Sequence, residues 1–171
     1  MDLRPYEPNS VHKYLAKLEE NGKMEAVVTQ NVDMLHEKAG TKKLYKIHGT
    51  IAQNHCDKCK KTYEMDYIFD NKDAIPRCDC GQHGIIRPDV VMYGEQLPAD
   101  QWKHSVNAIH KADCLIVCGT SLTVYPAANL VSEYAGKYLI IMNMTPTPYD
   151  NWADIVFNEN MNDVFDALSE N

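Results

Sequence analysis

A short, continuous apolar segment constrains the fold of this chain more than any other feature. Residues 114–118, Cys-Leu-Ile-Val-Cys, carry no charged side chain and are followed directly by Gly119. A helical pattern with apolar residues along one face precedes them over residues 99–111. An apolar run of this length that ends at glycine is typical of a strand buried on both faces, as strands are in parallel sheets.

The segments on either side alternate between helical and strand-like patterns. We expect further helices over residues 10–21, 32–39, 127–134 and 162–168, and further strands over residues 26–29, 138–142 and 154–157. Alternation of this kind is typical of α/β proteins, in which helices cover a mainly parallel sheet. The sequence therefore predicts an α/β fold with a parallel sheet.

The composition is that of an ordinary folded protein, and it excludes several other classes. The 171 residues are 44% hydrophobic and 24% charged, with a formal net charge of −7. No apolar stretch approaches the about 18 residues that a membrane span needs, and the first residues lack the pattern of a signal peptide. We therefore expect a cytoplasmic protein with no membrane partner, in a reducing compartment where clustered cysteines bind metals before they form disulfides.

Two close pairs of cysteines lie within a polar stretch of the chain. The pairs are Cys56 with Cys59, and Cys78 with Cys80. Thiolates at such spacing close a tetrahedron around zinc, and a closed site is structural because no position remains for water. The second pair is one residue tighter than usual, so His55 or His83 is an alternative ligand, and unligated buried thiols are the remaining interpretation. Residues 54–85 have few aliphatic side chains, so metal binding would supply folding free energy to this module.

Polar residues follow three of the predicted strands. The Gly-Thr-Ser segment at 119–121 follows one strand, Asn143 follows the next, and Thr-Gln-Asn-Val-Asp at 29–33 follows the first. Ligands of open α/β sheets bind beyond the carboxyl ends of strands, where hydroxyl and amide groups bond sugar and phosphate oxygens. Each segment alone is also consistent with a simple strand end. His48 lies nearby in the sequence; imidazole suits general-base chemistry near neutral pH, although a lone histidine is more often structural.

Taken together, these segments resemble the sirtuin family of NAD-dependent protein-lysine deacylases. The matching motifs occur in the family's order and approximate spacing over residues 8–168. They are residues 29–33, Leu35-His36, Ala39-Gly40, His48-Gly49, the two cysteine pairs, residues 87–91, Gly94-Glu95, residues 119–122, Val124, Pro126 and Asn143. The resemblance implies a Rossmann-type parallel sheet that carries a small inserted zinc-binding module, with NAD and an acyl-lysine peptide between them. The expected parts are residues 1–53, 54–86 and 87–171, of which the middle part is the module.

The resemblance also implies a role for individual residues. His48 matches the general base, which deprotonates a ribose hydroxyl of NAD, and Asn31 and Asp33 match further catalytic positions. The NAD-binding positions are matched by Gln30, Asn31, Asp33, Gly119, Thr120, Ser121, Asn143 and Met161. The positions along which a substrate peptide lies as an added strand are matched by Val91, Tyr93, Gly94 and Glu95. The zinc positions are matched by Cys56, Cys59, Cys78 and Cys80.

Two features depart from the family pattern. The tight spacing of Cys78 and Cys80 leaves the fourth zinc ligand open. The Gly-Ala-Gly-x-Ser loop and the Ile-Pro-Asp-Phe-Arg segment at the start of sirtuins do not occur in this sequence. That loop supplies a strand and the backbone N–H groups that receive the NAD diphosphate. We therefore expect an incomplete Rossmann-type sheet that lacks its N-terminal part.

Three hypotheses for the function follow. The first is roughly the last two-thirds of an NAD-dependent lysine deacylase, which releases nicotinamide and O-acyl-ADP-ribose. It needs the missing segment, from a second chain or a longer gene product, for activity, and apolar surface exposed at the missing strand favours self-association. The second is a catalytically silent, sirtuin-like interaction protein whose zinc module is the binding surface. The third, a zinc-ribbon nucleic-acid binder, is disfavoured by the net charge of −7.

Overall fold

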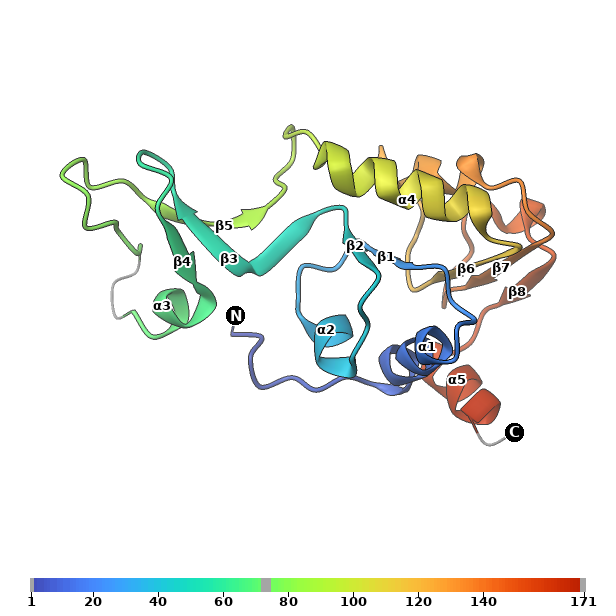
Figure 1. The fold of residues 1–171 in the computed structure, drawn as a ribbon. Helices are drawn as coiled ribbons and strands as arrows, with labels where there is room; N and C mark the ends of the chain where they lie inside the picture. Colours follow the sequence, from blue (N-terminus) through green and yellow to red (C-terminus); the bar gives the residue numbers. More distant parts are fainter. Residues whose placement is uncertain (1, 72–74, 170–171) are drawn as a thin grey trace.

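The computed structural model describes residues 2–71 and 75–169. Its helices are α1 (Ser10–Glu20), α2 (Leu35–Ala39), α3 (Met65–Phe69), α4 (Ala99–Lys111) and α5 (Met161–Ser169), with the 3-10 helices η1 (Ala127–Glu133) and η2 (Asp150–Trp152). Its strands are β1 (Val27–Thr29), β2 (Leu44–Lys46), β3 (Gly49–Cys56), β4 (Thr62–Glu64), β5 (Ile86–Val90), β6 (Cys114–Cys118), β7 (Tyr138–Met142) and β8 (Ile155–Phe157). Figure 1 shows β3, β4, β5 and α3 as a module at one end of a larger body. Within the described ranges, no helix has both the length and the apolar character needed to cross a membrane.

The body contains the predicted parallel α/β arrangement. β6, β7 and β8 form a parallel sheet in that order, with Leu115 opposite Leu139 and Met142 opposite Phe157. β6 and β7 have the bounds that the sequence predicts. Side chains alternate along β7: Leu139 and Ile141 pack against η1 on one face, and Met142 packs against α1 and α5 on the other. The core of the body therefore lies on both faces of β7.

β6 is less buried than its sequence predicts. Cys114 is exposed and residues 115–118 are half-buried, whereas a strand buried on both faces was expected. The physical reason is that, in the part of the chain that the structure describes, β6 pairs with β7 along one edge and with no strand along the other, and β1 pairs with β2 alone, in a separate parallel sheet. β1 and β6 thus each have one edge that no strand of the described residues covers.

The module is an antiparallel sheet with a very small apolar core. β3 lies between β4 and β5, and Cys56, Cys78 and Ile86 form the buried cluster beside them. β3 and β5 continue from the body into the module, and the boundaries expected after residues 53 and 86 fall inside these two strands. The periodicity of the sequence does not predict these strands, because polar residues occupy both of their faces.

Two predicted helices differ from the observed ones. α2 begins at Leu35 rather than at residue 32, because the Asp33 carboxylate accepts a hydrogen bond from the N–H of Leu35 at 2.9 Å. This bond keeps residues 32–34 outside the helix, and Gly40, with a φ of 100°, ends it. Residues 127–133 form the 3-10 helix η1 in place of a regular α-helix.

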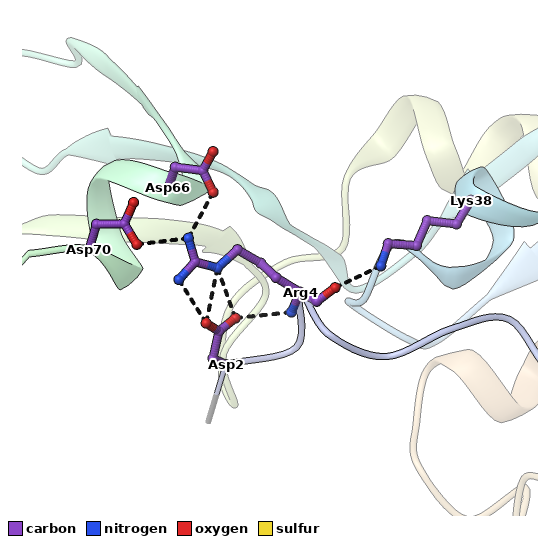
Figure 2. A network of polar contacts seen from close by, with 5 residues as sticks. All are labelled: Asp2, Arg4, Lys38, Asp66 and Asp70. Atoms are coloured by element: carbon purple, nitrogen blue, oxygen red, sulfur yellow. Dashed lines mark hydrogen bonds and ion pairs between the residues drawn. The ribbon is translucent and has the colours of Figure 1, made fainter.

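An N-terminal strap, residues 2–7, ties the module to the body (Figure 2). The Arg4 guanidinium donates hydrogen bonds to Asp66 and Asp70, one in α3 and one just after it, both at 2.9 Å. From α2, the Lys38 ammonium donates to the carbonyl oxygen of Arg4 at 2.8 Å. The two carboxylate side chains are 73% and 68% exposed, so water screens both ion pairs and their contribution to stability is small. The strap therefore orients the module more than it stabilises the fold.

Two buried histidines face each other where α1 packs on α2. The ring centroids of His12 and His36 lie 4.5 Å apart, and Asn9 contacts Nδ1 of His12. Nδ1 of His36 has no hydrogen-bond partner among the described residues. Burial lowers the pKa of both rings, and repulsion from His12 lowers that of His36 further. The carboxylates of Asp33 and Glu37 act in the opposite direction, but burial outweighs them.

Acidification should destabilise the fold through this histidine pair. The unfolded chain binds protons at both rings near the ordinary histidine pKa of about 6.5, whereas the folded chain keeps the rings neutral to lower pH. The free energy of unfolding is therefore retained above about pH 6.5 and falls below it, by up to about 1.4 kcal/mol per pH unit for each ring. Urea unfolding at about pH 7.5 and pH 5.5 measures this loss, which His36→Gln should reduce. An equal loss in both proteins would contradict the prediction.

Candidate functional site

His48 lies in the turn between β2 and β3 and is half-buried. Its Nδ1 lies 3.1 Å from the carbonyl oxygen of Gln30. Because a carbonyl oxygen only accepts, Nδ1 carries the proton of the neutral ring and Nε2 is left as the basic nitrogen. The carbonyl oxygen of His48 accepts a hydrogen bond from the N–H of Val91 at 3.0 Å. His48 therefore connects the 29–33 segment with the segment that follows β5.

A close approach of β3 to β5 fixes the position of His48. Gly49 pairs with Val90 and has a φ of 79°. A Cβ at Gly49 would lie 2.0 Å from the carbonyl oxygen of Asp89, a distance at which no side chain fits. The His-Gly dipeptide thus has a geometric cause, because the glycine lets the two strands meet and their meeting places His48 beside Val91.

The 29–33 segment reaches from the end of β1 toward the end of β6. The amide nitrogen of Gln30 donates a hydrogen bond to the Thr120 hydroxyl at 3.2 Å. Asn31 is exposed, and its N–H donates to the Thr29 hydroxyl at 3.0 Å. The carboxylate of Asp33 is engaged at the start of α2, as described above. The structure therefore brings Gln30, His48 and Thr120 together, while Asp33 also has a structural role.

Residues after β6, after β7 and at the start of α5 meet beyond the carboxyl ends of β6 and β7. Gly119 has a φ of 62°, and a Cβ there would lie 2.6 Å from Cε of Met161, so the Met161 side chain covers this glycine. The N–H of Gly119 donates to the carbonyl oxygen of Met142 at 2.9 Å, which keeps Asn143 level with Gly119. Ser121 is exposed next to them. The amide nitrogen of Asn143 donates to the carbonyl oxygen of Thr145 at 2.7 Å.

The segment after β5 presents an exposed ring and is shaped by an ion pair. Tyr93 is 98% exposed, and Gly94 has a φ of 86°. The Glu95 carboxylate accepts a hydrogen bond from the N–H of Met92 at 2.9 Å and two from the Arg87 guanidinium at 2.9 and 3.0 Å. Arg87 is the main cause of the lowered pKa of Glu95. Glu95 therefore holds the turn at Tyr93, and the sequence analysis did not assign this positioning role to Arg87.

The four clustered thiols have the geometry of a metal site. The sulfur atoms of Cys56, Cys59, Cys78 and Cys80 all lie within 4.8 Å of one another. Sγ of Cys56 lies 3.9 Å from Sγ of Cys80, and Sγ of Cys59 lies 3.6 Å from Sγ of Cys78. Zinc–sulfur bonds of about 2.3 Å in a tetrahedron place the sulfur atoms about 3.8 Å apart, whereas a disulfide needs about 2.05 Å. The arrangement therefore fits one zinc ion and does not fit disulfides.

Backbone N–H groups prepare this cluster for negative charge. The N–H groups of Lys58 and Cys59 each lie 3.4 Å from Sγ of Cys56. Hydrogen bonds from the N–H groups of Gly84 and Gln82 lower the pKa of Cys80 to about 6. These contacts favour thiolates, the form that binds zinc.

Neither of the two histidines considered as alternative ligands belongs to the group of potential metal ligands that lie close together among the described residues. The His55 ring pairs with the Asp89 carboxylate instead. The geometry thus favours Cys80 as the fourth ligand. Tyr63, whose hydroxyl donates to Sγ of Cys78 at 3.0 Å, is a further residue of this site that the cysteine spacing does not predict. The sequence feature that could have pointed to it is an aromatic residue seven positions after Cys56 in an otherwise polar module.

Comparison with known proteins gives a consistent result. The sequence model of the "Sir2 family" matches residues 1–126. The "NAD-dependent protein deacetylase" of Clostridium tetani (strain Massachusetts / E88) is 45% identical over 164 residues, which are 95% of this chain and 66% of the relative. The protein of the same name from Clostridium acetobutylicum is 46% identical over 169 residues, which are 98% of this chain and 68% of that relative. The chain thus spans about two-thirds of the length of these curated relatives.

Solved structures agree in fold as well as in sequence. The structure described as "Sir2-p53 peptide-NAD+" is 39% identical with a TM-score of 0.88, and the match covers 96% of this chain and 70% of that chain. The structure described as "Sir2 bound to acetylated peptide" is 38% identical with a TM-score of 0.88, again over 96% and 70% of the two chains. The α/β body, the four-cysteine module and these similarities agree, and the chain belongs to the Sir2 family of sirtuins.

Proposed function

We propose that this chain carries the catalytic part of an NAD-dependent protein-lysine deacylase, which removes an acyl group from lysine and releases nicotinamide and O-acyl-ADP-ribose. One observation carries the proposal: His48 contacts both Gln30 and Val91, so it lies between a polar strand end and a segment suited to hold a peptide. The names of the relatives and the related structure with an acetylated peptide support it.

His48 is the proposed general base. The hydrogen bond from Nδ1 to the Gln30 carbonyl leaves Nε2 free of its proton, so Nε2 can accept one from a ribose hydroxyl near neutral pH. NAD, when bound, supplies the ribose carbon that exchanges nicotinamide for the acyl oxygen. Gln30, Asn31 and Asp33 are proposed to line the pocket for nicotinamide and this ribose. The two amide groups offer donors and acceptors there without adding charge.

The remaining nucleotide contacts are proposed for Gly119, Thr120, Ser121, Asn143 and Met161. Their hydroxyl and amide groups suit the sugar hydroxyls of NAD. A nucleotide that approaches Gly119 meets Cε of Met161, the flexible end of a thioether side chain. The sequence contains no glycine-rich phosphate loop ahead of a helix. The residues present therefore fit the sugars of NAD better than its diphosphate.

We also propose that the complete nucleotide site needs one more parallel strand. β1 and β6 each have an uncovered edge among the described residues, and the contact of Gln30 with Thr120 brings their carboxyl ends close together. A strand between them would pair with both edges, bury β6, and present its following loop to the diphosphate. The third of the relatives' length that this chain does not span is its proposed source.

The proposed substrate is an acyl-lysine protein or peptide that binds as an added strand along Val91, Tyr93, Gly94 and Glu95. Backbone pairing of this kind supplies affinity with little demand on the peptide sequence. The exposed Tyr93 ring is available to pack on the lysine stem. A cavity of about 530 Å³ beside this segment, lined by residues of β3 and β5, leaves room for a neighbouring peptide side chain.

Nicotinamide release from NAD and an acetyl-lysine peptide tests the function. We expect turnover from this chain fused behind the N-terminal third of the Clostridium tetani relative, and much less from the chain alone. His48→Ala should lower the turnover of the fusion by about 10²- to 10⁴-fold, the usual contribution of a general base. The matched control is His110→Ala, because His110 is an exposed histidine that pairs with Glu133 on the surface.

The outcomes of this assay are distinct. Loss of turnover in His48→Ala but not in His110→Ala supports the assignment of the base. Similar turnover in both variants would remove His48 from that role. If the fusion releases no nicotinamide at all, the deacylase proposal fails and the silent, sirtuin-like interaction protein is favoured instead.

We further propose that the cysteine cluster binds one structural zinc ion and that the protein works in a reducing, cytoplasmic compartment where these thiols stay available. Metal analysis of the purified chain should find one zinc per chain. Cys59→Ser should lose the metal and the order of the module, because metal binding supplies its folding free energy. Cys114→Ser, which changes an exposed cysteine outside the cluster, should keep both. Protein purified without zinc, or a Cys59→Ser variant that retains it, would contradict the site.

A further inference from the structure

The first cysteines of the two pairs, Cys56 and Cys78, receive different numbers of hydrogen bonds from backbone N–H groups. The first pair has a two-residue gap, and its turn aims two backbone N–H groups at Sγ of Cys56. The second pair has a one-residue gap, and its turn aims one N–H at Sγ of Cys78, that of Cys80 at 3.3 Å. A buried thiolate needs hydrogen-bond donors in place of the water that it loses. Cys78 therefore receives one backbone donor where Cys56 receives two.

Tyr63 supplies a donor at this position. It is the middle residue of β4 and pairs with Asn54 of β3, so the sheet fixes its backbone next to the cluster. Its ring packs against the buried cysteine cluster, and its hydroxyl donates to Sγ of Cys78 at 3.0 Å. This contact is shorter than those of the Lys58 and Cys59 N–H groups to Cys56 and of the Cys80 N–H to Cys78.

Two charged residues decide whether the Tyr63 hydroxyl donates its hydrogen bond to the sulfur or elsewhere. The Tyr63 hydroxyl also lies 3.1 Å from a carboxylate oxygen of Asp79, which competes for the same proton. The Lys61 ammonium lies 2.7 Å from both carboxylate oxygens of Asp79. Lys61 thereby satisfies the carboxylate and weakens its competition. It also offsets the repulsion between Asp79 and a Cys78 thiolate, whose sulfur lies 3.6 Å away.

We propose that the Tyr63 hydroxyl holds the Cys78 thiolate in the zinc site, with Lys61 and Asp79 orienting it, and that this contact adds to the single backbone donor of Cys78. Tyr63 is a positioning residue, since it acts on the metal through its ligand. Outer hydrogen bonds of this kind orient metal ligands, and their loss typically lowers metal affinity by about 10- to 100-fold. The inference rests on the proposed zinc site.

Tyr63→Phe tests the proposal because it removes one oxygen and keeps the ring. The variant should still bind one zinc per chain, but with about 10- to 100-fold lower affinity in competition with a chelator. With cobalt(II) in place of zinc, its thiolate-to-metal absorption band should move to longer wavelength, because a thiolate without the hydrogen bond gives up electron density more easily. The matched control is Tyr67→Phe. The Tyr67 ring lies 4.6 Å from that of Tyr63, but its hydroxyl donates to the carbonyl oxygen of Arg77, at 3.5 Å, and not to a sulfur atom of the cluster among the described residues.

Unchanged affinity and an unchanged cobalt band in Tyr63→Phe would overturn the proposal, and so would equal losses in Tyr67→Phe. If Tyr63→Phe does not fold, Lys61→Gln is the second variant, because it changes an exposed side chain and frees Asp79 to draw the phenolic proton away. It should weaken zinc binding, and an unchanged affinity would overturn the proposal. Failure of the unsubstituted chain to bind zinc is a separate result, which refutes the zinc site itself.

Discussion

The structure depends on the close passage of β3 and β5 at Gly49. The Asp89 carbonyl occupies the space that any side chain at Gly49 would need, so the two strands meet there without a side chain between them. From this point the strands run in one direction into the cysteine module and in the other into the body. The same contact places the His48 carbonyl against the N–H of Val91. One backbone approach therefore joins the module, the proposed base and the proposed peptide segment.

The module and the body depend on different physical forces. The body buries aliphatic side chains on both faces of β7. The module buries mainly Cys56, Cys78 and Ile86, which is too little apolar surface for independent stability. Thiolate–metal bonds would supply the missing free energy, and the Tyr63 hydroxyl adds a polar contact where the backbone provides fewer donors. The strap through Arg4 then limits how the module sits against α2.

The sequence predicts the body better than it predicts the module. The apolar runs of β6 and β7 were predicted at their observed bounds, because buried parallel strands need continuous aliphatic residues. β3 and β5 have no such pattern, since hydrogen bonds and cysteines rather than a core stabilise them. The late start of α2 depends on one carboxylate, that of Asp33. The half-exposure of β6 arises because no second strand of the described residues pairs with its other edge. Neither can be found from local periodicity.

In the candidate site too, local sequence patterns predict some residues and do not predict others. Gly49 and Gly119 were noted as motif residues, and the structure adds the close contacts that require glycine there. Arg87 and Tyr63 act through partners that are distant in the sequence, so spacing alone did not predict their roles. The roles of the nucleotide and peptide residues remain predictions until substrate binding is measured.

The most direct test of this account is nicotinamide release by Gly49→Ala in the fused protein, with zinc content measured on the same sample. A methyl group at residue 49 must push β3 away from Asp89 and move His48, whereas Gly81→Ala adds its methyl group where no atom lies within 4 Å. Gly49→Ala should lose most of its turnover while it keeps one zinc per chain, and Gly81→Ala should keep both. Full turnover in Gly49→Ala would show that the approach of these strands does not position the base.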